Sequence, residues 1–119
     1  MNIFCYDVIM NYIKKEIEIN ENIYEILIGK NAYGNEEIIK MSDNDDLWFH
    51  INNLPSAHLI LKCKEKISKR DLYKIGNILL DHNKKVPRNS NIIYTKVKNI
   101  KLTNKLGSVI TKNTELLKM

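Results

Sequence analysis

A short stretch near the middle of the chain gathers side chains that suit contact with a nucleotide. Asp46, Trp48 and His50 alternate with apolar residues, so a strand over 46–51 would place all three on one face. A tryptophan ring stacks on bases, and a histidine donates hydrogen bonds to phosphate. Asp46 can orient an imidazole or accept a hydrogen bond from a ribose hydroxyl. The alternative interpretation is that Trp48 belongs to the core and that the two polar residues satisfy each other.

Two other kinds of site are conceivable around Asp46, His50 and the nearby His58. Acid–base catalysis on RNA is one, but the sequence contains neither a Gly-x-Ser-x-Gly nucleophile motif nor a P-loop. A metal site made of His50, His58 and Cys63 is the other, and its spacing fits no zinc signature. We therefore predict a binding site without a catalytic residue, a cofactor or a metal.

Positive charge is concentrated in the second half of the chain. Residues 1–60 contain four lysines and ten carboxylates, whereas residues 61–119 contain fifteen lysines and arginines and four carboxylates. This asymmetry predicts a half that faces a polyanion, the alternative being a merely solvated basic surface. Lysines outnumber arginines seventeen to two, which favours contact with a nucleic-acid backbone over reading of bases. An adaptor that binds a protein partner by strand addition is a third functional class.

The spacing of apolar and turn residues predicts a single α+β domain over residues 1–119. Hairpin strands at 16–19 and 24–28 precede a short helix over about 35–41, and strands at 46–51 and 58–62 follow. Ser68 starts the main helix, over about 68–84, whose apolar stripe predicts core packing. A strand over 92–98, extended by 99–102, precedes a closing strand or hairpin at 108–111 and 114–118. Strands before and after one main helix predict an antiparallel or mixed sheet.

The apolar residues 3–13 predict a packed terminal element. Asp7 interrupts this run, which is too short to span a bilayer and has neither the basic start nor the cleavage site of a secretion signal. The two cysteines, Cys5 and Cys63, do not indicate a secreted disulfide scaffold. We expect reduced thiols, a cytoplasmic location and no membrane partner.

Several motifs together resemble one known family. Gly29-Lys30-Asn31-Ala32-Tyr33-Gly34-Asn35-Glu36 is followed by Asp46-Leu47-Trp48-Phe49-His50 and by Pro55-Ser56-Ala57-His58. The tail from Tyr94 to Lys101, with Gly107-x-Val109 after it, adds to the pattern. Over roughly residues 24–110 the chain resembles the NFACT-R family of RNA-binding domains. It departs from the family at Lys101-Leu102-Thr103-Asn104-Lys105, where paired lysines and a Pro-Lys-Gly segment are common.

The resemblance implies an RNA-binding domain, with tRNA or ribosomal RNA as partner and the ribosome as a setting. Long family members act in ribosome quality control with further domains and coiled coils, which these residues do not contain. DNA is a second expected partner, although Ala32 stands where a DNA-sensing relative carries a second basic residue. The predicted nucleic-acid-binding residues are Lys30, Asn31, Asp46, Trp48, His50, His58, Arg88, Lys96, Lys98 and Lys101.

Overall fold

The computed structural model describes residues 2–9 and 11–119, with side chains from Asn11 onward. The helical segments are α1 (Ala32–Lys40), α2 (Lys69–His82) and the 3₁₀ turn η1 (Val97–Asn99). The strands are β1 (Asn2–Ile9), β2 (Tyr12–Ile19), β3 (Asn22–Gly29), β4 (Leu47–Ile51), β5 (Leu59–Lys62), β6 (Ile92–Lys96), β7 (Ile100–Leu102), β8 (Val109–Thr111) and β9 (Glu115–Leu117). The predicted α+β class is confirmed.

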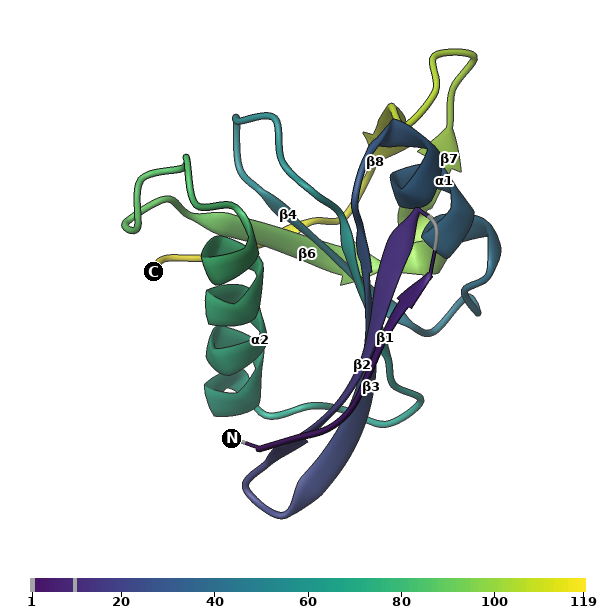
Figure 1. The fold of residues 1–119 in the computed structure, drawn as a ribbon. Coiled ribbons are helices and arrows are strands. Elements are labelled where there is room, and N and C mark those ends of the chain that lie inside the picture. The colour runs from purple at the N-terminus through teal and green to yellow at the C-terminus, as the bar shows by residue number, and fades with distance from the viewer. Residues whose placement is uncertain (1, 10) are drawn as a thin grey trace.

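Within the described residues, one antiparallel sheet has seven strands in the order β1-β2-β3-β5-β4-β6-β9. The predicted hairpin is β2–β3, and its turn residues Asn20 and Glu21 have φ of 51° and 70°. Left-handed residues of this kind match the twist of a two-residue hairpin turn. The hairpin β7–β8 is a separate two-stranded sheet. Figure 1 shows α2 on one side of the large sheet and α1 with β7–β8 on the other.

The side of the sheet under α2 carries the larger apolar core. Ser68 caps α2 by accepting a hydrogen bond from the Asp71 N–H, at 3.2 Å, as the sequence predicts. The helix then lays its apolar stripe on the inward side chains of the strands. Fully buried members of this core include Ile17, Ile26, Ile28, Phe49, Ile51, Leu59, Leu61, Ile75, Leu79 and Ile92. The strand alternation predicted for Phe49 and Ile51 is therefore confirmed.

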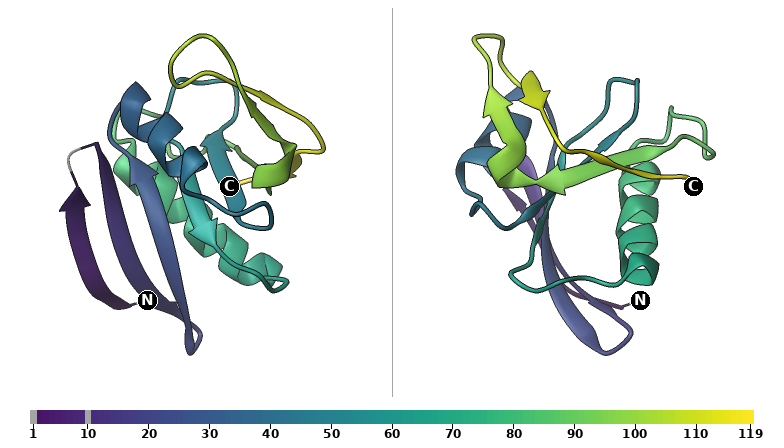
Figure 2. Two further views of the ribbon diagram at one scale, coloured as in Figure 1. Left: turned by 90° about the vertical axis from the view of Figure 1, so that its right-hand side faces the viewer. Right: turned by 180° about the vertical axis from the view of Figure 1, so that it is seen from behind.

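The opposite side of the sheet has a smaller core, covered by α1 and the β7–β8 hairpin (Figures 1 and 2). Its buried members are Leu27, Ile38, Ile39, Trp48, Ile60 and Val97. Ile100, Leu102 and Val109 of the hairpin pack against it. This side of the sheet is thus covered by a helix of nine residues and a short hairpin, whereas the other side is covered by the longer helix α2.

Two boundaries differ from the prediction, and the predicted choice between a closing strand and a hairpin near the C-terminus is decided for the strand. The short helix begins at Ala32, because Asn31 caps it, and Asn35 lies inside its first turns. β6 ends at Lys96, where η1 redirects the chain, so residues 100–102 pair with β8 in a second sheet. Residues 115–117 pair with β6 and form no hairpin with β8. Glycine and proline, the usual signals of such a change of direction, are absent from Val97–Asn99.

The N-terminal residues form strand β1, which pairs with β2 at one edge of the sheet. The packing predicted for the side chains of 3–10, and the state of Cys5, lie outside the described residues. Cys63 is a free thiol. Among the described residues, neither helix has the length and apolar character needed to cross a bilayer.

Candidate nucleic-acid interface

The loop that carries Lys30 is held tightly between β3 and α1. The Gly29 N–H donates to the His58 carbonyl at 3.0 Å, and the Lys30 N–H donates to the Asn11 carbonyl at 2.9 Å. The Asn31 side chain caps α1 by accepting from the Gly34 N–H at 2.9 Å. Because these bonds fix the backbone, the exposed Lys30 side chain is presented from a rigid base.

Gly107, at the tip of the β7–β8 hairpin, docks on the first turn of α1. Its N–H donates to Glu36 Oε2 at 3.3 Å. Its φ is +76°, and a Cβ at this position would lie 2.9 Å from the Cβ of Ala32, so glycine is required for the close approach. An ion pair with Lys40 and the Gly107 N–H lower the pKa of Glu36, which keeps its carboxylate charged for this contact.

This docking puts the hairpin tip next to the segment that follows the lysine loop, and both carry exposed side chains. Tyr33 is 65% exposed beside Lys30, and Lys105 and Leu106 are exposed at the hairpin tip. Lys101 faces outward from β7, opposite the exposed Ile110 of β8. We call this set the loop–hairpin surface: Lys30, Asn31, Tyr33, Lys101 and Lys105.

Trp48, His50 and His58 form a compact aromatic cluster on the α1 side of the sheet. The rings of Trp48 and His50 are stacked, with centroids 5.6 Å apart and planes 5° apart. His58 meets both rings edge-on, at 5.4 Å and 5.0 Å. Trp48 is 2% exposed and His58 is 4% exposed, so neither ring offers a face to a base, and only His50 reaches the surface. The alternative interpretation of Trp48 as a core residue is the correct one.

The two histidines of the cluster are neutral at physiological pH. Burial lowers the pKa of His58 to about 3, and the neighbouring His50 adds to the shift. Burial also lowers the pKa of His50. The Trp48 Nε1–H donates to His58 Nδ1 at 3.2 Å, so the neutral His58 ring carries its proton on Nε2. The histidines therefore add shape and hydrogen bonding to this region, and the positive charge comes from lysines.

The backbone of His58 connects the aromatic cluster to the lysine loop. Its N–H donates to the Asn35 side chain at 3.0 Å, and its carbonyl accepts from Gly29. A Cβ on Gly29 would lie 2.0 Å from the same Asn35 oxygen, so the strand end, α1 and β5 are locked together here. Asn35 and Gly29, which the sequence offers as a motif, act as positioning residues.

Asp46 lies apart from the histidines. It accepts hydrogen bonds from Lys62 Nζ, from the Cys63 N–H at 3.2 Å and from the Asp43 N–H at 2.9 Å, and it is 1% exposed. His50 lies four positions further along the extended chain, a span of about 13 Å. The expectation that Asp46 fixes an imidazole is therefore wrong, and an Asp46–His50–His58 catalytic group is not assembled. Among the described residues, no three metal-ligating side chains are grouped.

The remaining predicted residues are dispersed over the molecule. Lys96 lies on the α2 side of the sheet and pairs with Asp45 at 3.6 Å. Arg88 pairs with Asp81 at 2.6 Å, near the end of α2. Lys98 is exposed in η1, at the base of the hairpin. Three residues that matter for the loop–hairpin surface were not predicted as site residues: Tyr33, Lys105 and Gly107. Two sequence signals point to them: the motif from Gly29 to Glu36 contains Tyr33, and the Leu106-Gly107 pair directly follows Lys105.

Known proteins are similar to this chain in sequence and in fold. The family described as the NFACT protein RNA binding domain matches residues 10–117. Coiled-coil domain-containing protein 25 of Mus musculus is 34% identical over 94 residues, which cover 71% of this chain and 44% of that protein. The Danio rerio protein of the same name is 35% identical over 89 residues, covering 67% and 42%. The chain thus spans less than half the length of these curated relatives.

A solved structure shares the fold. It is titled as the C-terminal part of the fibronectin/fibrinogen-binding protein from Streptococcus suis, and it matches 88% of this chain and 43% of that chain. The TM-score is 0.76 at 19% sequence identity. The match to the family over residues 10–117 and the identity to the curated relatives carry the assignment. This chain belongs to the NFACT RNA-binding domain family.

Proposed function

We propose that this chain binds structured RNA, such as tRNA or ribosomal RNA, through the loop–hairpin surface. In this proposal Lys30, Lys101 and Lys105 contact backbone phosphates, and Tyr33 offers an exposed ring for stacking. The setting would be the cytoplasm, on or near ribosomes, in translation or ribosome quality control. The observation that supports the proposal is the docking of Gly107 on α1, which puts the hairpin tip that carries Lys105 against the start of the helix that follows Lys30.

Lysine chemistry makes recognition of the backbone the main contribution. An ammonium group is a mobile point charge, which fits phosphates at many positions without reading a base edge. Tyr33 can stack on any base, since every base has a π-face. His50 is partly exposed, neutral and stacked on Trp48, and it would accept or donate one hydrogen bond. We therefore expect binding that depends on RNA shape more than on sequence.

Charge reversal at Lys30 tests the proposal. Lys30→Glu should weaken binding of tRNA about tenfold, because one phosphate contact is lost and a repulsion is added. The dependence of affinity on salt should also become shallower by about one phosphate contact. The measurement is fluorescence anisotropy with labelled tRNA over a series of salt concentrations.

Lys85→Glu is the matched control, because Lys85 is an exposed lysine in the segment after α2, away from the loop–hairpin surface. It changes the net charge equally and should weaken binding much less than Lys30→Glu. Equal losses for the two variants would mean that net charge alone governs binding, and the proposed surface would be refuted.

A further inference from the structure

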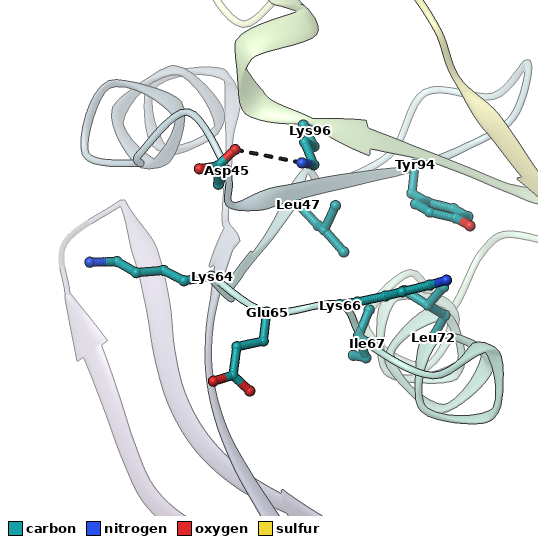
Figure 3. Close-up of a pocket in the computed structure, with 9 residues that line it drawn as sticks. All are labelled: Asp45, Leu47, Lys64, Glu65, Lys66, Ile67, Leu72, Tyr94 and Lys96. Atoms are coloured by element: carbon teal, nitrogen blue, oxygen red, sulfur yellow. Dashed lines mark ion pairs between the residues drawn. The ribbon is translucent and has the colours of Figure 1, made fainter.

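A cavity lies on the opposite side of the sheet from α1. Its volume is about 390 Å³, which is at the lower end of the range for small-molecule sites. It opens between the start of β4, the end of β6 and the segment that leads into α2 (Figure 3). None of the residues of the loop–hairpin surface lines it. Its walls are formed by Asp45, Leu47, Lys64, Glu65, Lys66, Ile67, Leu72, Tyr94 and Lys96.

The floor of the cavity is apolar and belongs to the larger core. Ile67 is 9% exposed and Leu72 is 5% exposed, so both are fixed by packing. One side of the Tyr94 ring is stacked on Phe49, with centroids 5.6 Å apart and planes 22° apart. An aromatic ring held in this way is a preformed surface on which a flat group can pack without an ordering cost.

Lysines form the rim of the cavity. Figure 3 shows Lys66 extended toward Leu72 and Tyr94, while Lys64 and Glu65 point away from Leu47. Lys96 also lines the cavity, where its ion pair with Asp45 is exposed and therefore weak. Among the described residues, Lys66 makes no ion pair within 4.0 Å. Two ammonium groups are thus placed at the edge of an apolar floor.

The charge of the lining limits the ligand that fits. Three lysines and two carboxylates leave one net positive charge. A ligand with one or two negative charges is favoured, and a polyphosphate would meet the carboxylate of Asp45. A flat apolar ring can pack on the floor of the cavity, while a single phosphate joined to the ring pairs with the lysines at the rim.

We propose that this cavity binds a nucleoside monophosphate unit, with its base on Tyr94 and Leu72 and its phosphate at Lys66 and Lys96. The unit can come from a free nucleotide or from an unpaired residue of a nucleic-acid strand. This site lies on the α2 side and does not depend on the RNA site proposed on the loop–hairpin surface.

The test is a titration of the ¹⁵N-labelled chain followed by amide NMR shifts. The probes are AMP, adenosine, inorganic phosphate and a short single-stranded oligoadenylate. AMP or the oligoadenylate should shift the amides around Leu47, Ile67 and Tyr94, and adenosine and phosphate should each bind more weakly. Shifts with AMP identify a free nucleotide as a ligand, whereas shifts with the oligoadenylate alone identify a strand residue.

Variants of Lys66 test whether the lysines at the rim of the cavity contribute to nucleotide binding. Lys66→Ala should weaken the binding of whichever nucleotide probe shifts these amides roughly three- to tenfold, and Lys66→Arg should preserve it. Lys69→Ala is the control, since Lys69 is exposed on α2 and does not line the cavity.

The proposal is overturned if neither AMP nor the oligoadenylate shifts these amides. It is also overturned if phosphate binds as well as AMP, or if Lys66→Ala and Lys69→Ala have equal effects. Lys66→Ala should change the affinity for tRNA less than Lys30→Glu does, which separates this site from the one at Lys30.

Discussion

The two sides of the central sheet are held by different kinds of contact. Under α2 the core is almost wholly apolar, with the buried carboxylate of Asp71 only at its edge, where Asn20 and Tyr24 donate to it at 2.8 and 2.9 Å. On the α1 side, buried polar groups take part: His58, Asn35 and Thr95. Apolar burial is not directional, whereas hydrogen bonds fix orientation. The α2 side therefore supplies most of the stability, and the α1 side positions exposed residues.

Thr95 shows how the polar contacts position the hairpin. Its hydroxyl donates to the Asn113 carbonyl at 3.0 Å and accepts from the Asn99 side chain at 2.8 Å. These bonds join β6 to the segments on both sides of the β7–β8 hairpin. At the other end of the hairpin, Gly107 bonds to Glu36. The hairpin is thus held at its base and at its tip.

The largest effect on stability is expected from the α2 side. Phe49→Ala should lower the free energy of unfolding by about 3–5 kcal/mol, because it opens a cavity in a fully buried core. Urea unfolding measures this loss, and the folded fraction should bind tRNA as the wild type does. A loss below about 1 kcal/mol would contradict the assignment of this core.

The neighbouring residue offers a milder change on the other side, aimed at a hydrogen bond and not at packing volume. Trp48→Phe should cost about 1–3 kcal/mol, because His58 Nδ1 loses its buried donor while much of the ring volume is kept. A larger loss than for Phe49→Ala would reverse the comparison between the two sides.

Mild acid should destabilise the fold through the α1 side. The unfolded chain protonates His58 near pH 6.5, whereas the folded chain keeps it neutral down to a pKa of about 3. Between these values the unfolded state binds more protons, so stability falls as the pH falls. From pH 7 to pH 5 the loss attributable to His58 is about 2 kcal/mol. Urea unfolding at several pH values measures it.

His58→Gln removes the titrating group and keeps a hydrogen-bond acceptor for Trp48. This variant should lose the part of the pH dependence that comes from His58 and keep the part that comes from His50 and His82, whatever its overall stability. His82→Gln is the control from the α2 side, since His82 is only partly buried and burial also lowers its pKa. If His82→Gln flattened the pH profile and His58→Gln did not, the aromatic cluster would not be the source.

The smallest change in stability is expected at Gly107. This position tests whether docking of the hairpin tip, as distinct from packing of the core, matters for RNA binding. Gly107→Ala should cost about 1 kcal/mol, because a side chain strains the positive φ and approaches Ala32 too closely. Its effect on tRNA affinity should be larger than this cost suggests, since the hairpin tip moves away from Lys30. Asn104→Ala, in the same loop, should leave both quantities near the wild-type values. An unchanged affinity in Gly107→Ala would show that docking of the tip is not needed.

The sequence alone predicts the two faces of β4 correctly. Alternation separates Phe49 from Trp48, and the structure places these two rings in different cores. Alternation does not reveal what covers a face, so it leaves open whether Trp48 lies at the surface or in a core. The cover comes from α1 and from the hairpin after η1, and the sequence around Val97–Asn99 contains no turn signal that predicts this hairpin.

Charge was also an incomplete guide to the site. Lys96 and Arg88 belong to the basic half of the chain, but they lie away from the loop–hairpin surface and pair with Asp45 and Asp81. Charge counts carry no information on which lysines become neighbours, because this depends on the path of the hairpin. Lys30 was predicted from a motif, and the structure places it on an anchored loop.

The most direct test of the central claim is a map of the RNA-contacting surface by amide NMR shifts with unlabelled tRNA. We predict that the largest shifts fall on the loop at 29–33 and on the hairpin tip at 103–107, with smaller shifts near His50. Shifts absent from both segments and confined to the exposed face of α2 would contradict the account.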